Sequence, residues 1–158
     1  MSTPVSPPKA LIPHLVCSPA AEAIEFYKKA FDAVEVFRLP CEDGRLMHAA
    51  LTIDGQSLYL VDDFPEYCGG KSTTATALGG TAVTIHRNVP NCDEAVEKAV
   101  KAGATIQMPP TDAFWGDRYA VINDPYGHSW SFAHPLKKMS PEELKAAMDK
   151  EMSQHAPA

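Results

Sequence analysis

The spacing of apolar residues changes several times in the first third of the chain, and each change predicts a new element. A short apolar run at 10–17 predicts a strand. Apolar residues at helical spacing then predict an amphipathic helix, with Ser18 as its N-cap and Pro19 as its first residue. The apolar positions of that helix are Ala23, Ile24, Tyr27 and Phe31. Three further strands are expected at 34–39, 45–53 and 56–61, the last two joined by a turn at Asp54-Gly55.

The second half of the chain repeats this order of elements. A strand at 81–87 precedes a helix that starts with a capping-box-like Asn91-Cys92-Asp93-Glu94 and ends near Gly103. Identical residues recur at an offset of 127 − 55 = 72. Such pairs include His14 with His86, Glu22 with Glu94, Lys29 with Lys101, Gly55 with Gly127 and Ser57 with Ser129. An internal repeat predicts a pseudo-two-fold architecture with a ligand cleft where the copies meet.

The predicted fold class is therefore α+β, with two β-α-β-β-β modules in tandem and an added C-terminal helix. That last helix is expected because Ser140-Pro141-Glu142-Glu143 combines an N-cap, a helical proline and a capping-box glutamate. The expected boundaries are a flexible tail at 1–9, modules at 10–63 and 80–135, a linker or lid loop at 64–79, and the C-terminal helix and tail at 136–158.

The composition and charge of the chain limit the classes of partner that we expect it to bind. A net charge of −6 argues against nucleic acid and against an anionic membrane surface. No run approaches the roughly 18 apolar residues that a membrane span needs, and no signal peptide is recognisable, so a cytoplasmic location is expected. The four cysteines form no C-x-x-C pair and are expected to be free thiols.

Several motifs resemble one known group of proteins. The helix motif Ala23–Tyr27 and the turn Asp124-Pro125-x-Gly127 resemble the vicinal oxygen chelate superfamily, which includes glyoxalases, bleomycin resistance proteins and extradiol dioxygenases. Phe114–Arg118, followed by Asp124–Trp130, resembles its PhnB-like branch. The resemblance covers about residues 10–135. It implies a cup formed by two modules, within one chain or between two chains, and a homodimer is expected.

The resemblance also bears on metal binding. Metal-using members take ligands from the first and last strands of each module, typically His, His and Glu. The matching last-strand positions are Tyr59 and Ser131, which are poor ligands for a divalent ion. His14 and His86 lie about two residues from the matching first-strand positions. No metal cofactor is therefore expected. The alternative is a divalent ion such as Zn²⁺ held by His14 and His86 in a glyoxalase-like lyase or isomerase.

Four residues on predicted strands are expected to bind a ligand in the cleft. His14 and His86 share a repeat position and line the cavity in this interpretation. His48 lies on one strand face with Ala50 and Thr52, and either reaches the cleft or packs as a satisfied histidine. Tyr59 places a phenol at a position where relatives hold a ligand.

Three further candidates come from the segment 111–135. Trp115, in an apolar loop, is expected to stack on a ligand. Arg118 either pairs with Asp117 to fix that loop or binds a ligand carboxylate or phosphate. Trp130 either belongs to the core or forms a platform for the ligand. His134, at the end of the last strand, is expected to be solvated.

These observations predict a protein that binds a small aromatic or amphipathic molecule between its modules without a metal. Whether it catalyses a reaction stays open, with the metal-dependent lyase or isomerase as the alternative. No nucleophile elbow, phosphate-binding loop or dinucleotide-binding glycine pattern is present in the sequence.

Overall fold

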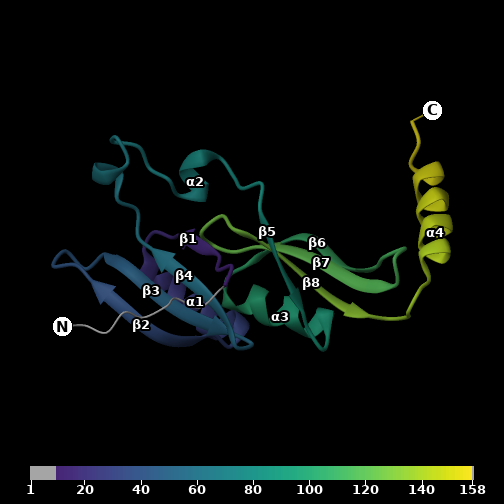
Figure 1. Ribbon diagram of the computed structural model, residues 1–158, viewed down its shortest axis with the longest axis horizontal. Helices are drawn as coiled ribbons and strands as arrows, with labels where there is room; N and C mark the ends of the chain where they lie inside the picture. The colour runs from purple at the N-terminus through teal and green to yellow at the C-terminus, as the bar shows by residue number, and fades with distance from the viewer. Residues whose placement is uncertain (1–9, 158) are drawn as a thin grey trace.

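The computed structural model describes residues 10–157, so the tail predicted at 1–9 lies outside it (Figure 1). The first module contains β1 (His14–Val16), α1 (Ala20–Phe31), β2 (Val34–Pro40), β3 (Leu46–Ile53) and β4 (Gln56–Val61). The second contains β5 (Thr84–Asn88), α3 (Cys92–Ala102), β6 (Thr105–Asp112), β7 (Asp117–Asn123) and β8 (Ser129–Pro135). Between and after them lie η1 (Pro65–Tyr67), α2 (Ala75–Leu78) and α4 (Pro141–Gln154).

Each module folds into one four-stranded sheet, in the orders β1-β4-β3-β2 and β5-β8-β7-β6. The first strand of each module pairs in parallel with the last, and the other pairings are antiparallel. The helices obey the same offset, because α1 begins at Ala20 and α3 at Cys92, and 92 − 20 = 72. The predicted fold of tandem β-α-β-β-β modules with a C-terminal helix is confirmed.

The start of α1 differs from the prediction. Ser18 is not the N-cap; Pro19 occupies that position and offers no side-chain acceptor. Buried Asp62, after β4, accepts hydrogen bonds from the backbone N–H of Ala20 at 3.0 Å and of Leu46 at 2.7 Å. A carboxylate at a helix N-terminus satisfies a free amide and complements the helix dipole. A distant residue therefore replaces the expected local cap.

The second module fills the same position with a different acceptor. His134 lies 134 − 62 = 72 residues after Asp62, and its Nδ1 accepts a hydrogen bond from the N–H of Cys92 at 2.8 Å. The expectation that His134 is simply solvated was wrong, because its imidazole satisfies the first amide of α3. The predicted Asn91 cap of that helix is present and accepts from Glu94 N–H at 3.1 Å.

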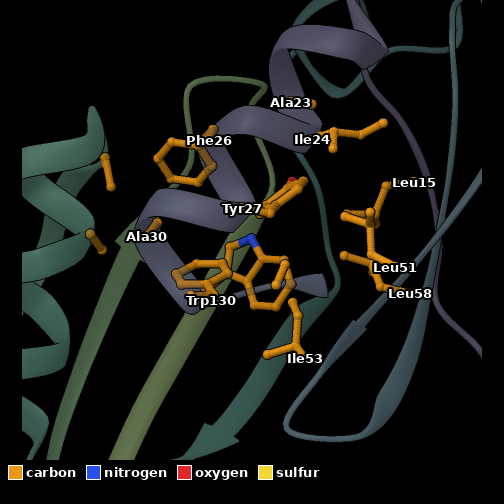
Figure 2. Close-up of a cluster of buried hydrophobic side chains, with 14 of the residues drawn as sticks. Leu15, Ala23, Ile24, Phe26, Tyr27, Ala30, Leu51, Ile53, Leu58 and Trp130 are labelled. Carbon is orange, nitrogen blue, oxygen red and sulfur yellow. The ribbon is translucent and has the colours of Figure 1, made fainter. Parts of the chain in front are cut away.

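The two modules share one hydrophobic core. The helices α1 and α3 pack against each other, and each also covers its own sheet (Figure 1). Figure 2 shows Tyr27 of α1 beside Trp130 of β8, with Leu51 and Leu58 of the first sheet on the same side of the helix. The rings of Phe31 and Trp130 lie 4.7 Å apart between centroids. Aromatic contacts of this kind add stability beyond burial alone, so the contact between the modules stabilises both of them.

The connection between the modules packs on the second one. Its short helix α2 contacts the β7–β8 turn so closely that a Cβ atom on Gly127 would lie 3.1 Å from Ala75 Cβ. Near its start, Phe64 is buried under the Arg45 guanidinium, which lies 4.2 Å from the ring centroid. These two contacts tie both ends of the connection to the body.

The helix α4 lies at the far end of the molecule from the first sheet (Figure 1). Its N-terminus has the predicted capping box between Ser140 and Glu143, and none of its residues is buried. Within residues 10–157, no helix combines the length and hydrophobicity of a membrane span. The four cysteines are free thiols, as expected, with Cys17 and Cys92 buried.

Candidate functional site

Each sheet is covered by a helix on one face only. We call the opposite faces open face 1, on the first sheet, and open face 2, on the second. The strand register places His14, Tyr59, Ala50 and Phe37 in one row across open face 1. The same register places Thr111, Tyr119, Ala133 and Asn88 in one row across open face 2. Side chains on these rows are mostly half-buried or exposed in the single chain.

Open face 1 gathers three of the predicted ligand-binding residues. Ring centroids lie 5.9 Å apart for His14 and His48, 6.0 Å for His14 and Tyr59, and 4.8 Å for His48 and Tyr59. We call these three residues the histidine–tyrosine cluster. They come from β1, β3 and β4, which are neighbouring strands because β1 pairs with β4 and not with β2.

The cluster contains the two histidines of this chain that have no hydrogen-bond partner among residues 10–157. His86, His128, His134 and His155 each form one or more hydrogen bonds with protein atoms. Partial burial lowers the pKa of His14, and the nearby His48 lowers it further. His14 is therefore biased toward its neutral form.

Open face 2 holds His86 in a hydrogen-bonded setting. Its Nδ1 lies 2.7 Å from Ser131 Oγ and its Nε2 lies 3.1 Å from Asn88 Oδ1. The imidazole stacks on Tyr119 at 6.3 Å, and Tyr119 contacts the edge of Trp115 at 5.3 Å. Sequence reasoning found His86 and Trp115 but missed Tyr119, although its alternation with Val121 along one strand placed it on this face.

Arg118 does not reach open face 2, and its predicted partner was wrong. Its guanidinium binds Asp93 of α3 through Nε at 2.5 Å and Nη2 at 2.8 Å, and Asp112 through Nη1 at 2.8 Å. Asp117 instead accepts a hydrogen bond from Trp115 Nε1 at 3.0 Å. Arg118 therefore fastens α3 to its sheet, and no donor remains directed at a ligand on the open side.

Trp130 belongs to the core, which was one of its two predicted roles. It is 1% exposed, and its indole N–H donates to Asp124 Oδ2 at 2.9 Å. The Tyr27 hydroxyl donates to the same oxygen at 2.5 Å. Burial raises the pKa of Tyr27 well above its ordinary value, so the phenol stays a donor. The side chain of Trp130 also lines a cavity between the two modules.

A crevice runs between β1 and β5, where the edges of the two sheets approach each other. It consists of two adjoining cavities of about 360 Å³ and about 420 Å³. They share walls formed by Leu11, Ile12, Pro13 and Ile85. His86 lines the smaller cavity and His14 lines the larger one, together with His128. We call this feature the inter-module crevice. It places both repeat-related histidines at the module junction, although in separate cavities.

The residues present do not fit the alternative metal site. Among residues 10–157, no group of three or more His, Cys, Asp or Glu side chains is placed to hold a metal ion. Both ring nitrogens of His86 already have partners in Ser131 and Asn88. Zinc sites in enzymes normally use three protein ligands, so His14 and His86 in one chain do not supply a sufficient donor set.

Comparisons with known proteins agree with the fold. A protein of Mycobacterium tuberculosis, Rv0887c, which is described as uncharacterized, is 53% identical over 139 residues, covering 88% of this chain and 82% of that protein. The X-ray structure of the Arabidopsis thaliana gene product At5g48480 is 27% identical, with a TM-score of 0.63, over 82% of this chain and 100% of that one. The PhnB protein from Bacillus cereus shares the fold, with a TM-score of 0.55 at 20% identity over 77% of this chain and 94% of that one.

A family model matches residues 11–132, which include both modules from β1 to the middle of β8. Its description is the glyoxalase/bleomycin resistance protein/dioxygenase superfamily. The resemblance noted in the helix motif and in the Asp124–Gly127 turn is thereby confirmed. This chain belongs to the glyoxalase/bleomycin resistance protein/dioxygenase superfamily.

Proposed function

We propose that this protein binds a small amphipathic molecule with an aromatic part at the junction of its two modules, without a metal ion. The observation that carries the proposal is the histidine–tyrosine cluster, whose polar atoms have no protein partner in the described part of the chain, beside a crevice whose shared walls are apolar. Ligand sites typically combine a mainly apolar pocket of about 300–1,000 Å³ with a few polar groups that orient the ligand. Each cavity of the crevice is within that range.

Aromatic side chains on both open faces support an aromatic ligand. On open face 1, Phe37 lies 6.4 Å from His48 between ring centroids. On open face 2, Tyr119 and Trp115 are in edge contact, and the hydrogen bond to Asp117 holds the Trp115 indole in place. Fixed aromatic rings provide a large contact area with little loss of side-chain entropy on binding.

We also propose that a second copy of the chain covers the open faces. Phe37 and Leu39 are 51% and 48% exposed on open face 1, and Met108 is 45% exposed at the edge of open face 2. Contiguous exposed apolar side chains on a sheet are typical of interfaces. In such a homodimer, open face 2 of one copy would cover open face 1 of the other, and with it the histidine–tyrosine cluster beside the crevice.

The dimer is tested by sedimentation equilibrium of the wild-type chain and of Leu39→Glu. We expect a wild-type dimer and a monomeric variant, because a buried carboxylate without a partner opposes association. Tyr67→Glu is the matched control, since Tyr67 is 74% exposed in the connection between modules and away from both faces. A monomeric wild-type protein, or a dimer unaffected by Leu39→Glu, would contradict this part of the proposal.

Binding in the crevice is tested with the neutral fluorophore N-phenyl-naphthylamine, which becomes bright in apolar surroundings. We expect saturable binding that is weakened about tenfold in Ile12→Glu. Ile12 is half-buried and lines both cavities, so a charge there disfavours the dye by roughly 1.4 kcal/mol or more. Leu78→Glu is the control, because Leu78 is exposed in α2 and lines neither cavity. Failure to saturate, or equal binding by both variants, would refute the crevice as the site.

A further inference from the structure

The histidine–tyrosine cluster points to the chemical class of the ligand. We infer that His14, His48 and Tyr59 bind a carboxylate group of the ligand, and that binding is accompanied by uptake of a proton. The inference rests on the proposed function, since it supplies the polar end of the molecule whose aromatic part lies in the crevice.

The first argument is the hydrogen-bonding capacity that the cluster leaves unused. Each neutral imidazole has one donor nitrogen and the phenol has one donor oxygen. None of these atoms has a protein partner within residues 10–157, whereas the other four histidines do. A carboxylate accepts up to about four hydrogen bonds on its two oxygens. One such group is therefore able to satisfy all three side chains.

The second argument is the geometry of the three strands. His14 and Tyr59 are direct register partners on β1 and β4, and His48 follows on β3, one row from Ala50. The ring centroids lie 4.8–6.0 Å apart, with interplanar angles near a right angle. All three side chains lie on open face 1, so one group bound above the sheet would be within reach of each of them.

The third argument is electrostatic. The residues that share register rows with the cluster on open face 1 are Ala50, Phe37 and Leu39, all uncharged. The nearby acids are already used on the other side of the sheet: Glu35 binds Lys28 and Arg38, and Asp62 binds two backbone amides. A protein with a net charge of −6 thus keeps its acids away from this cluster. An anion bound there would meet little local repulsion.

Neutral donors without Arg or Lys favour a carboxylate over a phosphate. Phosphate sites in proteins are usually built from guanidinium or ammonium groups and from helix N-termini. The groups around His14 are His48 and Tyr59 on the sheet, and Thr81, His128 and Ser129 across the larger cavity. Since none of them carries a permanent positive charge, a singly charged group is the better match.

Proton uptake follows from the state of His14 in the unliganded chain. Partial burial and His48 lower its pKa, so its neutral form is favoured. A bound anion acts in the opposite direction, because an opposite charge nearby favours the protonated imidazole. The ligand carboxylate stays ionised well below neutral pH. Affinity should therefore increase as the pH falls toward the histidine range and decrease as it rises.

The test compares naphthoate with its neutral amide, naphthamide, by isothermal titration calorimetry. We expect naphthoate to bind at least about tenfold more tightly at about pH 6.5, because charge-assisted hydrogen bonds are roughly twice as strong as neutral ones. The preference should fall to about threefold or less in His14→Gln, His48→Gln and Tyr59→Phe, because naphthoate loses more affinity than naphthamide in each variant. His155→Gln is the matched control, because His155 is exposed and follows the last residue of α4.

The proton is measured by repeating the naphthoate titration in two buffers of different ionisation enthalpy. The expected uptake approaches one proton per naphthoate and disappears in His14→Gln. Equal affinity for naphthoate and naphthamide would overturn the carboxylate inference and leave binding in the crevice intact. A preference that survives all three cluster variants would overturn the assignment to these residues. Binding of neither compound at millimolar concentration would overturn the proposed function and this inference with it.

Discussion

Asp124 joins the two modules through its side chain, and replacing it by alanine should destabilise the whole chain. The carboxylate is buried and accepts four hydrogen bonds. Two come from buried side chains, the Tyr27 hydroxyl and the Trp130 indole, at 2.5 and 2.9 Å. The other two come from backbone amides of Tyr126 and His128, at 2.9 and 3.0 Å.

The size of the stability loss depends on which donors are left without any acceptor, from the protein or from water. In Asp124→Ala, the Tyr27 and Trp130 donors stay in the core without an acceptor, at about 1–3 kcal/mol each. The two backbone amides are only part-buried in the β7–β8 turn, so water replaces the carboxylate there at about 1 kcal/mol or less in total. The expected loss is therefore about 2–7 kcal/mol, a large share of the stability of a typical domain.

The assay is equilibrium unfolding in urea, followed by circular dichroism and by tryptophan fluorescence. Asp124→Ala should lower the transition midpoint without changing its slope, because the folded state keeps the same buried surface. Tyr27→Phe alone should cost about 1.5–3 kcal/mol, the value of a hydrogen bond to a charged acceptor. In the double variant the two losses should fall short of additivity.

Asp112→Ala is the control for the loss of a carboxylate as such, because Asp112 is 67% exposed and pairs with Arg118 at the surface. It should change stability by about 1 kcal/mol or less. A loss below about 1 kcal/mol for Asp124→Ala, or strict additivity with Tyr27→Phe, would refute the reasoning.

Three further outcomes are expected. His134→Ala should destabilise by about 0.5–2 kcal/mol through the lost acceptor at the start of α3, whereas His134→Asp, which copies Asp62, should keep amide protection of that turn in hydrogen exchange. Hydrogen bonds from Arg38 and Lys28 lower the pKa of Glu35 to about 2. The stabilisation by these bonds is therefore present above about pH 4.5 and is lost as the pH falls toward 2. In Glu35→Gln, the free energy of unfolding in urea should change less with pH over that window. Gly116→Ala should destabilise far more than Gly44→Ala in thermal unfolding, since both have positive φ but only at Gly116 would a Cβ meet a carbonyl oxygen at 2.7 Å.

Local periodicity and the repeat were enough to predict the modules. The offset that relates His14 to His86 also relates the starts of the two helices. The elements predicted in one module therefore supported the same prediction in the other. The alternation along β3 and β4 placed His48 and Tyr59 on one face, and the parallel β1–β4 pairing of this module type brought His14 beside them. Each residue of the cluster was therefore predicted from the sequence as a ligand-binding candidate, but their contact with one another was not.

The failures share a physical cause, which is that distant partners prevailed over local ones. Ser18 was expected to cap α1, but Asp62 satisfies the first amide from 62 − 20 = 42 residues away. Pairing with its neighbour Asp117 was one of the two roles expected for Arg118, but Asp93 presents both carboxylate oxygens from α3. Adjacent residues on a strand point to opposite faces, so Asp117 and Arg118 are poorly placed to meet. That rule was available from the sequence, whereas the position of α3 over β7 was not.

The Asp62 and His134 pair shows what a repeated unit preserves after its two copies diverge. The positions correspond, and so does the task of accepting a hydrogen bond from the first amide of a helix. The residue type does not correspond, since one copy uses an anion and the other an imidazole. Relatives that differ at either position are thus better compared by acceptor geometry than by identity. An exchange of modules between relatives would therefore need to move α1 together with Asp62, and α3 together with His134.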